Sequence, residues 1–157
     1  MEKTLVIYYS LNGSTKFAAE KFAEKFNGNL LEIKPEKDIG PKGVMRYIRG
    51  GKQVFMKEKP QLLPFDKNIN DYDFIIIGTP VWSWTFTPAI RTLLSMIDIQ
   101  AKKIGLFCCH EGGAGKTLAN MAQELAGNQI VFQLDFKKVF NNREEVAQRI
   151  AELQLED

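Results

Sequence analysis

The sequence predicts an α/β domain built on an open, doubly wound, parallel sheet of five strands with helices on both faces. Short apolar runs rich in β-branched residues, such as residues 4–9 (TLVIYY) and 74–78 (FIIIG), are typical of strands buried on both faces. Between such runs lie stretches with apolar residues at helical spacing, so strands and helices alternate. A length of 157 residues is that of a single domain, and we expect one domain over residues 1–157.

Each element is expected from its own pattern. The segments with strand character are residues 4–9, 30–33, 74–78, 104–109 and 130–136. The second and the last of these alternate between apolar and polar residues, which favours edge positions in the sheet. The helical stripes consist of Phe17, Ala18, Phe22 and Phe26, of Ile90, Leu93, Leu94 and Ile97, of Leu118, Met121, Ala122 and Leu125, and of Val146, Ile150 and Leu153.

Two helix starts are marked in the sequence. Thr87 followed by Pro88 predicts an N-cap and a first-turn proline. Asn142 and Glu145 are spaced for a capping box ahead of the last helix. Residues 41–60 also show helical spacing, but Gly50 and Gly51 interrupt it, each at a cost of about 1 kcal/mol relative to Ala. We expect two short helices or one bent helix there.

Charge and composition exclude several classes of function. The net charge is +2, from 21 basic and 19 acidic side chains, which argues against nucleic acid as a partner because phosphate backbones need a clustered basic face. Most of the basic excess lies in residues 34–59, where a solvated helix face is one interpretation and a docking face is another. The residues in question are Lys42, Arg46, Arg49 and Lys52.

Cysteine and histidine are scarce. Cys108 and Cys109 are adjacent and give no disulfide framework, which favours a reducing compartment. With one histidine, His110, and no spaced Cys or His pairs, a tetrahedral metal site is not expected. No run approaches the roughly 20 apolar residues of a membrane span. We therefore expect a cytoplasmic protein without a metal.

The loop after the first strand, residues 10–15, reads SLNGST. In a doubly wound sheet, ligands bind beyond the carboxyl ends of the strands, beside the point where the strand order reverses. Hydroxyl groups, a glycine and the free N–H groups of a helix start together favour a phosphate at this place. An ordinary hydroxyl-rich N-cap is the other interpretation of the same residues.

The loop after the third strand, residues 79–87, is uncharged and contains Trp82, Trp84 and Phe86. Aromatic side chains gathered at a ligand-bearing edge can stack on a planar ring, although burial against the following helix explains them equally well. The loop after the fourth strand, residues 109–117, resembles a nucleotide-triphosphate loop in Gly115, Lys116 and Thr117, but His110 stands where that motif needs glycine. A glycine-rich turn that leads into the next helix is the plainer interpretation.

Together these loops resemble the flavodoxin family. The most specific parts are Tyr8-Tyr9-Ser10 through Thr15 and the run Gly78-Thr79-Pro80-Val81-Trp82. The resemblance implies the strand order 2-1-3-4-5 and the cofactor FMN, with the phosphate on the first loop and the ring between the other two. It makes Trp82 the first candidate for stacking on the ring and Trp84 the second. The implied cofactor-binding residues are Ser10, Leu11, Asn12, Gly13, Ser14, Thr15, Thr79, Pro80, Val81, Trp82, Ser83, Trp84, Cys109, His110, Glu111, Gly112 and Gly113.

The resemblance also implies a function. We expect an FMN-binding electron-transfer flavoprotein, more an electron carrier than an enzyme with its own substrate, whose partners are redox proteins or a small-molecule electron acceptor. The protein would act as a monomer or a homodimer. The low net charge and the lack of an aromatic side chain in the third loop keep two alternatives open. These are an FMN-dependent NAD(P)H oxidoreductase acting on quinones or similar acceptors, and a non-catalytic binding module.

Overall fold

A parallel sheet forms the centre of the molecule. The computed structural model describes residues 2–37 and 59–155. Its parallel strands lie in the order β2 (Asn29–Glu32), β1 (Thr4–Tyr8), β3 (Phe74–Trp82), β5 (Lys103–His110) and β6 (Gln129–Lys137). Counted over the parallel strands alone, this is the predicted order, and β2 and β6 occupy the predicted edges. Most of the helix expected within residues 41–60, with its four basic residues, lies outside the described residues.

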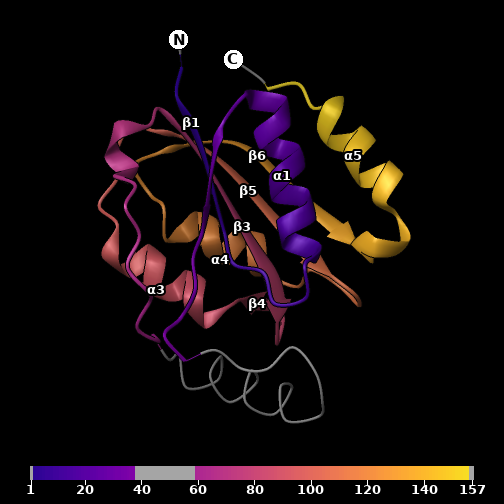
Figure 1. Ribbon diagram of the computed structural model, residues 1–157, viewed down its shortest axis with the longest axis horizontal. Helices are drawn as coiled ribbons and strands as arrows, with labels where there is room; N and C mark the ends of the chain where they lie inside the picture. Colours follow the sequence, from indigo (N-terminus) through magenta and orange to yellow (C-terminus); the bar gives the residue numbers. More distant parts are fainter. Residues whose placement is uncertain (1, 38–58, 156–157) are drawn as a thin grey trace.

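The helices form a layer on each side of the sheet (Figure 1). One layer consists of α1 (Ser14–Phe26) and α5 (Arg143–Ala151), and the other of α3 (Pro88–Met96) and α4 (Thr117–Gln123). Short 3₁₀ turns occupy Ile69–Asp71 and Val139–Asn141. The predicted doubly wound α/β fold is therefore confirmed.

The core has two halves, one on each face of the sheet. Alternate residues of β1 point to opposite faces, so Leu5 and Ile7 pack with α3 and α4, whereas Val6 and Tyr8 pack with α1 and α5. Phe22 of α1 stacks on Phe132 of β6 with ring centroids 5.2 Å apart. Burial of β1, β3 and β5 on both faces explains why these strands have nearly continuous apolar sequences.

The third strand differs most from its predicted length. β3 continues to Trp82, and Thr85–Phe86 returns beside it as the short antiparallel strand β4, with Val81 opposite Phe86. Residues 79–82 and 85–86, expected in a loop, are therefore strand residues, and only Ser83 and Trp84 form the turn. The physical reason is that Val, Trp, Thr and Phe all favour extended backbone.

The helix starts are placed as predicted, but their side chains act differently. α3 begins at Pro88 after the N-cap Thr87, whose hydroxyl lies 3.3 Å from the buried Thr79 hydroxyl and does not cap the helix. Asn142 is the N-cap of α5, yet its side-chain amide donates to the carbonyls of Lys137 and Lys138 (3.0 and 3.2 Å). The capping box expected at Asn142 is therefore wrong, because the side chain closes the preceding turn instead.

Candidate functional site

Three chain segments meet at the carboxyl edge of the sheet, where β1, β3 and β5 end. β1 lies between β2 and β3. The chain therefore runs from β1 to β2 on one side and then crosses to β3 on the other side, so the strand order reverses at β1. The fold thus brings together the loops at residues 9–13, 83–84 and 111–116. All the predicted cofactor-binding residues lie in these loops or at the adjoining ends of β3, β5 and α1.

The first loop is organised by its own side chains. Ser10 Oγ accepts hydrogen bonds from the backbone N–H groups of Gly13 (3.1 Å) and Lys16 (3.2 Å). Asn12 Oδ1 accepts from the N–H of Ser14 (3.1 Å). Gly13 has a φ of 98°, a left-handed conformation that favours glycine, and it is the N-cap of α1. Ser10, Asn12 and Gly13 therefore shape the loop and turn the chain into the helix.

Two hydroxyl groups at the start of α1 have unusual surroundings. Ser14 Oγ and Thr15 Oγ1 are buried, and within the described chain neither has a nitrogen or oxygen partner. The first turn of α1 contains no acidic residue. An unpaired buried hydroxyl costs about 1–3 kcal/mol, so such groups call for a partner. Hydroxyl groups at the N-terminus of a helix, where the helix dipole favours negative charge, are suited to bind an anion.

The two tryptophans of the second segment lie in different environments. Trp82, at the end of β3, packs edge-on against Tyr9 with ring centroids 5.7 Å apart, and it contacts the core below. Trp84, in the turn, is 73% exposed. Of the pair, Trp84 therefore has the free aromatic face, while Trp82 helps to support the edge.

The third segment is open on one side. A Cβ added at Gly112 or Gly113 would meet nothing within 4 Å. Gly115, by contrast, has a φ of 57°, and a Cβ there would lie 2.6 Å from Trp84 Cβ. The Thr117 hydroxyl donates to the Ala114 carbonyl (2.6 Å), so it is engaged within the loop. These contacts do not favour the triphosphate-loop alternative, in which the Gly115-Lys116-Thr117 backbone would wrap around phosphates.

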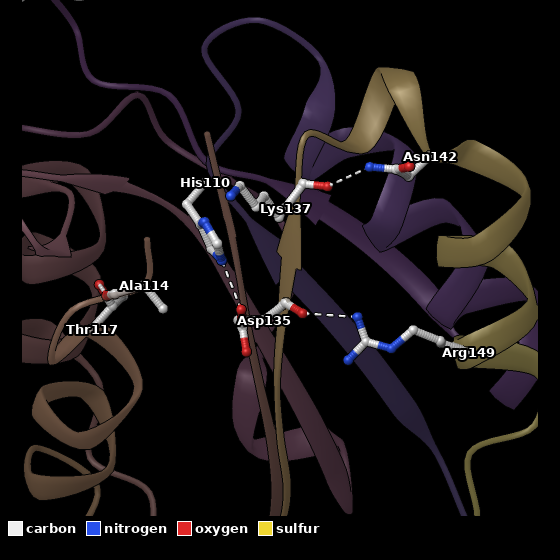
Figure 2. A network of polar contacts seen from close by, with 7 residues as sticks. All are labelled: His110, Ala114, Thr117, Asp135, Lys137, Asn142 and Arg149. Carbon is white, nitrogen blue, oxygen red and sulfur yellow. Dashed lines mark hydrogen bonds and ion pairs between the residues drawn. The ribbon is translucent and has the colours of Figure 1, made fainter. Parts of the chain in front are cut away.

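His110 ends β5 and pairs with an acidic residue of β6 (Figure 2). Its Nε2 lies 2.7 Å from Asp135 Oδ2. The His110 side chain is only 7% exposed, whereas that of Asp135 is 51% exposed. His110 Nδ1 is buried without a hydrogen-bond partner among the described residues. The Arg149 guanidinium donates to the Asp135 carbonyl oxygen (3.0 Å), which ties α5 to this strand.

The two cysteines are buried thiols. Burial raises the pKa of Cys109 to about 12, and a contact with the Thr15 hydroxyl acts weakly in the opposite direction. Burial likewise raises the pKa of Cys108 well above its usual range, and its neighbours Cys109 and Asp135 add to this effect. Thiols held in the protonated form are poor nucleophiles, so the burial of both cysteines disfavours reaction at their sulfur atoms.

Some residues at this edge were not identified from the sequence. Phe140 lies against Gly13, since a Cβ added there would be 3.2 Å from the Phe140 ring, and the Arg143 guanidinium lies over that ring. Asn120 of α4 donates to the Thr85 hydroxyl (2.9 Å). Asp135, which pairs with His110, was not expected at this edge either. These residues come from distant parts of the chain, and no local motif marks them.

The fold and this edge define a doubly wound α/β domain with a hydroxyl-rich loop at its switch point. A family model described as Flavodoxin matches residues 3–152. The chain therefore belongs to the flavodoxin family, and the resemblance found in its loops is confirmed.

Solved structures with the same fold include several flavoproteins. A flavoprotein from Lactobacillus acidophilus, determined in complex with FMN, is 26% identical, with a TM-score of 0.75 over 90% of this chain and 98% of that one. A flavoprotein from Bacteroides uniformis is 24% identical, with a TM-score of 0.80 over 95% and 97% of the two chains. A WrbA-like flavodoxin from Agrobacterium tumefaciens is 18% identical, with a TM-score of 0.63 over 96% and 94%. No curated protein matched the sequence.

Other classes of site were sought over residues 2–37 and 59–155. None of the helices there is both long enough and apolar enough to span a membrane. The same residues contain no group of three or more His, Cys, Asp or Glu side chains that could hold a metal ion.

Proposed function

We propose that this protein is an electron-transfer flavoprotein that binds FMN at the carboxyl edge of its sheet. The observation that carries the proposal is the pair of buried hydroxyls, Ser14 Oγ and Thr15 Oγ1, at the start of α1. They fit a phosphate, which can accept their hydrogen bonds at the end of the helix where the dipole favours negative charge. The FMN complex of the Lactobacillus acidophilus flavoprotein supports the same ligand.

The other predicted residues fit the remaining parts of FMN. Ser10, Asn12 and Gly13 would shape the phosphate loop, and the segments around Pro80–Trp84 and Cys109–Gly113 would line the ring. Trp84 is the stronger candidate for stacking because its face is exposed, whereas Trp82 packs against Tyr9. When bound, FMN supplies the redox chemistry, while the protein orients the ring and leaves one edge accessible.

An oxidoreductase is the second candidate. The third segment has open space beside Gly112 and Gly113 and no aromatic side chain that would cover the ring. A nicotinamide, and then a quinone or similar acceptor, could therefore approach the ring face. In this case the protein would take electrons from NAD(P)H itself, whereas a carrier would receive them from a partner protein.

FMN binding is tested by titration. Purified protein is stripped of flavin under denaturing conditions, refolded, and titrated with FMN while the flavin fluorescence is followed. We expect saturation at one FMN per chain with quenched fluorescence, and weaker binding of riboflavin because riboflavin lacks the phosphate. A protein that neither quenches FMN nor distinguishes it from riboflavin would contradict the proposal and favour a binding module.

The choice between carrier and oxidoreductase is tested by reduction. FMN-loaded protein is mixed with NADPH or NADH without oxygen, and the loss of flavin absorbance is followed. A carrier should be reduced only after a separate flavin reductase is added. Rapid reduction by the nicotinamide alone, followed by reoxidation with a quinone, would assign the oxidoreductase function instead.

A further inference from the structure

The turn that carries Trp84 has a conformation that its own residues disfavour. Ser83 and Trp84 connect two antiparallel strands, and both have positive φ angles, 49° and 63°. A two-residue turn of this kind is normally formed by Asn and Gly, because each other residue in the left-handed region costs about 1–2 kcal/mol. The local sequence does not explain the turn, so tertiary contacts must stabilise it.

The hairpin itself is too short to hold the turn. β4 contains only Thr85–Phe86 and forms two residue pairs with β3, Val81 with Phe86 and Trp82 with Thr85. The base of the hairpin is secured, since the Thr87 N–H donates to the buried Thr79 hydroxyl (3.2 Å). Isolated two-stranded hairpins are marginally stable at best, so the tip requires support from another element.

The start of α4 provides that support. The Lys116 N–H donates to the Trp84 carbonyl (3.1 Å), and the Asn120 side-chain amide donates to the Thr85 hydroxyl (2.9 Å). Gly115 lets the two backbones approach, because any side chain there would lie within 3 Å of the Trp84 backbone. The support is itself fixed by the buried Thr117, whose hydroxyl donates to the Ala114 carbonyl (Figure 2).

We propose that the Asn120–Thr85 hydrogen bond, together with the close packing of Gly115, holds the Trp84 turn in the shape that the FMN ring requires. Asn120 and Thr85 are then positioning residues that raise affinity by ordering Trp84 before FMN arrives. This inference rests on the proposed function, because it assumes that Trp84 contacts the ring. The inference also explains Gly115 and Thr117 of the segment that resembles a triphosphate loop, because both support the Trp84 turn.

The experiment uses the Trp82→Phe protein as its reference, so that Trp84 is the chain's remaining tryptophan. In this background, Thr85→Val removes the hydroxyl with little change in shape, Thr85→Ser keeps it, and Asn120→Ala removes the donor. Thr92→Val in α3 is the matched control. It breaks the hydrogen bond from the Thr92 hydroxyl to the Pro60 carbonyl (2.6 Å), which lies away from the loops. The FMN dissociation constant, the near-ultraviolet circular dichroism of the FMN-free protein and its thermal unfolding are measured for each.

We expect Thr85→Val and Asn120→Ala each to raise the FMN dissociation constant about five- to tenfold, as the loss of one hydrogen bond predicts. The double variant should bind FMN as tightly as either single variant does, because both changes break the same hydrogen bond. Both should also weaken the Trp84 dichroism band before FMN is added. Thr85→Ser should behave as the reference, and Thr92→Val should lower the unfolding temperature without changing affinity.

The outcomes separate the inference from the proposed function. Unchanged affinity in both Thr85→Val and Asn120→Ala would overturn the inference, and so would fully additive losses in the double variant. If the unsubstituted protein and the reference both bind no FMN, the proposed function fails, while the dichroism still tests whether Asn120 and Thr85 order Trp84. An unchanged Trp84 band would then overturn the positioning role as well.

Discussion

The first loop and the hairpin turn lie at the same edge of the sheet but are held in different ways. The first loop, residues 10–15, is closed by Ser10 and Asn12, which bond backbone groups no more than six positions away. The turn at Ser83 and Trp84 is held by Lys116 and Asn120, which follow a whole strand and helix later. A site can thus combine a segment whose conformation is fixed by its own side chains with a segment whose conformation depends on contacts with distant parts of the chain.

The two regions also differ in what they leave unsatisfied. The first loop buries two hydroxyl groups without nitrogen or oxygen partners among the described residues, whereas the turn exposes a large aromatic side chain. The first arrangement suits a charged, hydrogen-bonding group, and the second suits a flat apolar one. We therefore expect each region to contain substitutions that mainly lower FMN affinity and others that mainly lower stability.

Gly115→Ala should have the largest effect, and it tests the dependence of the turn on α4. An alanine at a φ of 57° is strained, and its methyl group would lie 2.6 Å from Trp84 Cβ, next to backbone that cannot move freely. We expect the free energy of unfolding in urea to fall by at least about 2 kcal/mol and FMN binding to weaken.

Gly112→Ala is the matched variant for stability, because its methyl group meets nothing within 4 Å. It should leave the free energy of unfolding within about 0.5 kcal/mol of the unsubstituted protein. Equal effects of the two glycine substitutions would show that the Trp84 turn does not depend on close packing at Gly115.

Trp84→Ala and Trp82→Ala separate stacking from support. Trp84 is largely exposed, so its loss should leave unfolding nearly unchanged while it weakens FMN binding by about 1–3 kcal/mol. Trp82 contacts Tyr9 and the core, so its loss should destabilise the FMN-free protein. Fluorescence titration measures the FMN affinity of both variants, and urea unfolding measures their stability. Unaltered FMN affinity in Trp84→Ala would transfer the stacking role to Trp82 or Phe86.

Ser14→Ala should lower FMN affinity without lowering stability, as Trp84→Ala should in the hairpin turn. The substitution removes a buried hydroxyl that has no partner in the FMN-free protein, so the free energy of unfolding should stay the same or rise by up to about 1 kcal/mol. FMN binding should weaken by about 1–2 kcal/mol, since a hydrogen bond to the charged phosphate is lost.

Ser10→Ala provides the contrast within the same loop. Ser10 Oγ accepts two backbone hydrogen bonds, so this variant should destabilise the FMN-free protein by about 1 kcal/mol. If Ser14→Ala destabilised the FMN-free protein as much as Ser10→Ala, then the Ser14 hydroxyl would have a structural partner and would not be reserved for a ligand.

The smallest effect is expected at alkaline pH, from the buried thiol below the site. Burial raises the pKa of Cys109 to about 12 in the folded protein, whereas in the unfolded chain it ionises near its ordinary value of 9.0. Its contribution to stability is therefore fully present below pH 9 and is lost as the pH rises toward 12. The free energy of unfolding should fall by about 1 kcal/mol between pH 8 and pH 10 on this account.

Cys109→Ala should remove this share of the fall and leave the share of Cys108, whose pKa is also raised by burial. In the unsubstituted protein, a thiol reagent at pH 8 should modify the two cysteines only as fast as the chain unfolds. Rapid modification under native conditions would show that the strand end at Cys109 opens locally.

Much of the fold could be predicted from the sequence because its signals are local. Continuous apolar runs marked β1, β3 and β5, and helical spacing marked the four described helices. The prediction and the structure differ where a side chain has more than one possible hydrogen-bond partner nearby. Asn142 has the right position for a capping box, but it bonds to the Lys137 and Lys138 carbonyls, since the left-handed Lys138 places both within reach.

The candidate site likewise contains features that follow from local sequence and features that depend on tertiary contacts. By itself, the sequence determined the shape of the first loop, because Ser10, Asn12 and Gly13 act on backbone groups within the same few residues. Only the tertiary structure decided that Trp84 is exposed and Trp82 is packed, that Gly115 supports the turn, and that Asp135 pairs with His110. The physical reason is distance along the chain. A hydrogen bond within a turn has a local pattern, whereas contacts between loops exist only after the strands have brought them together.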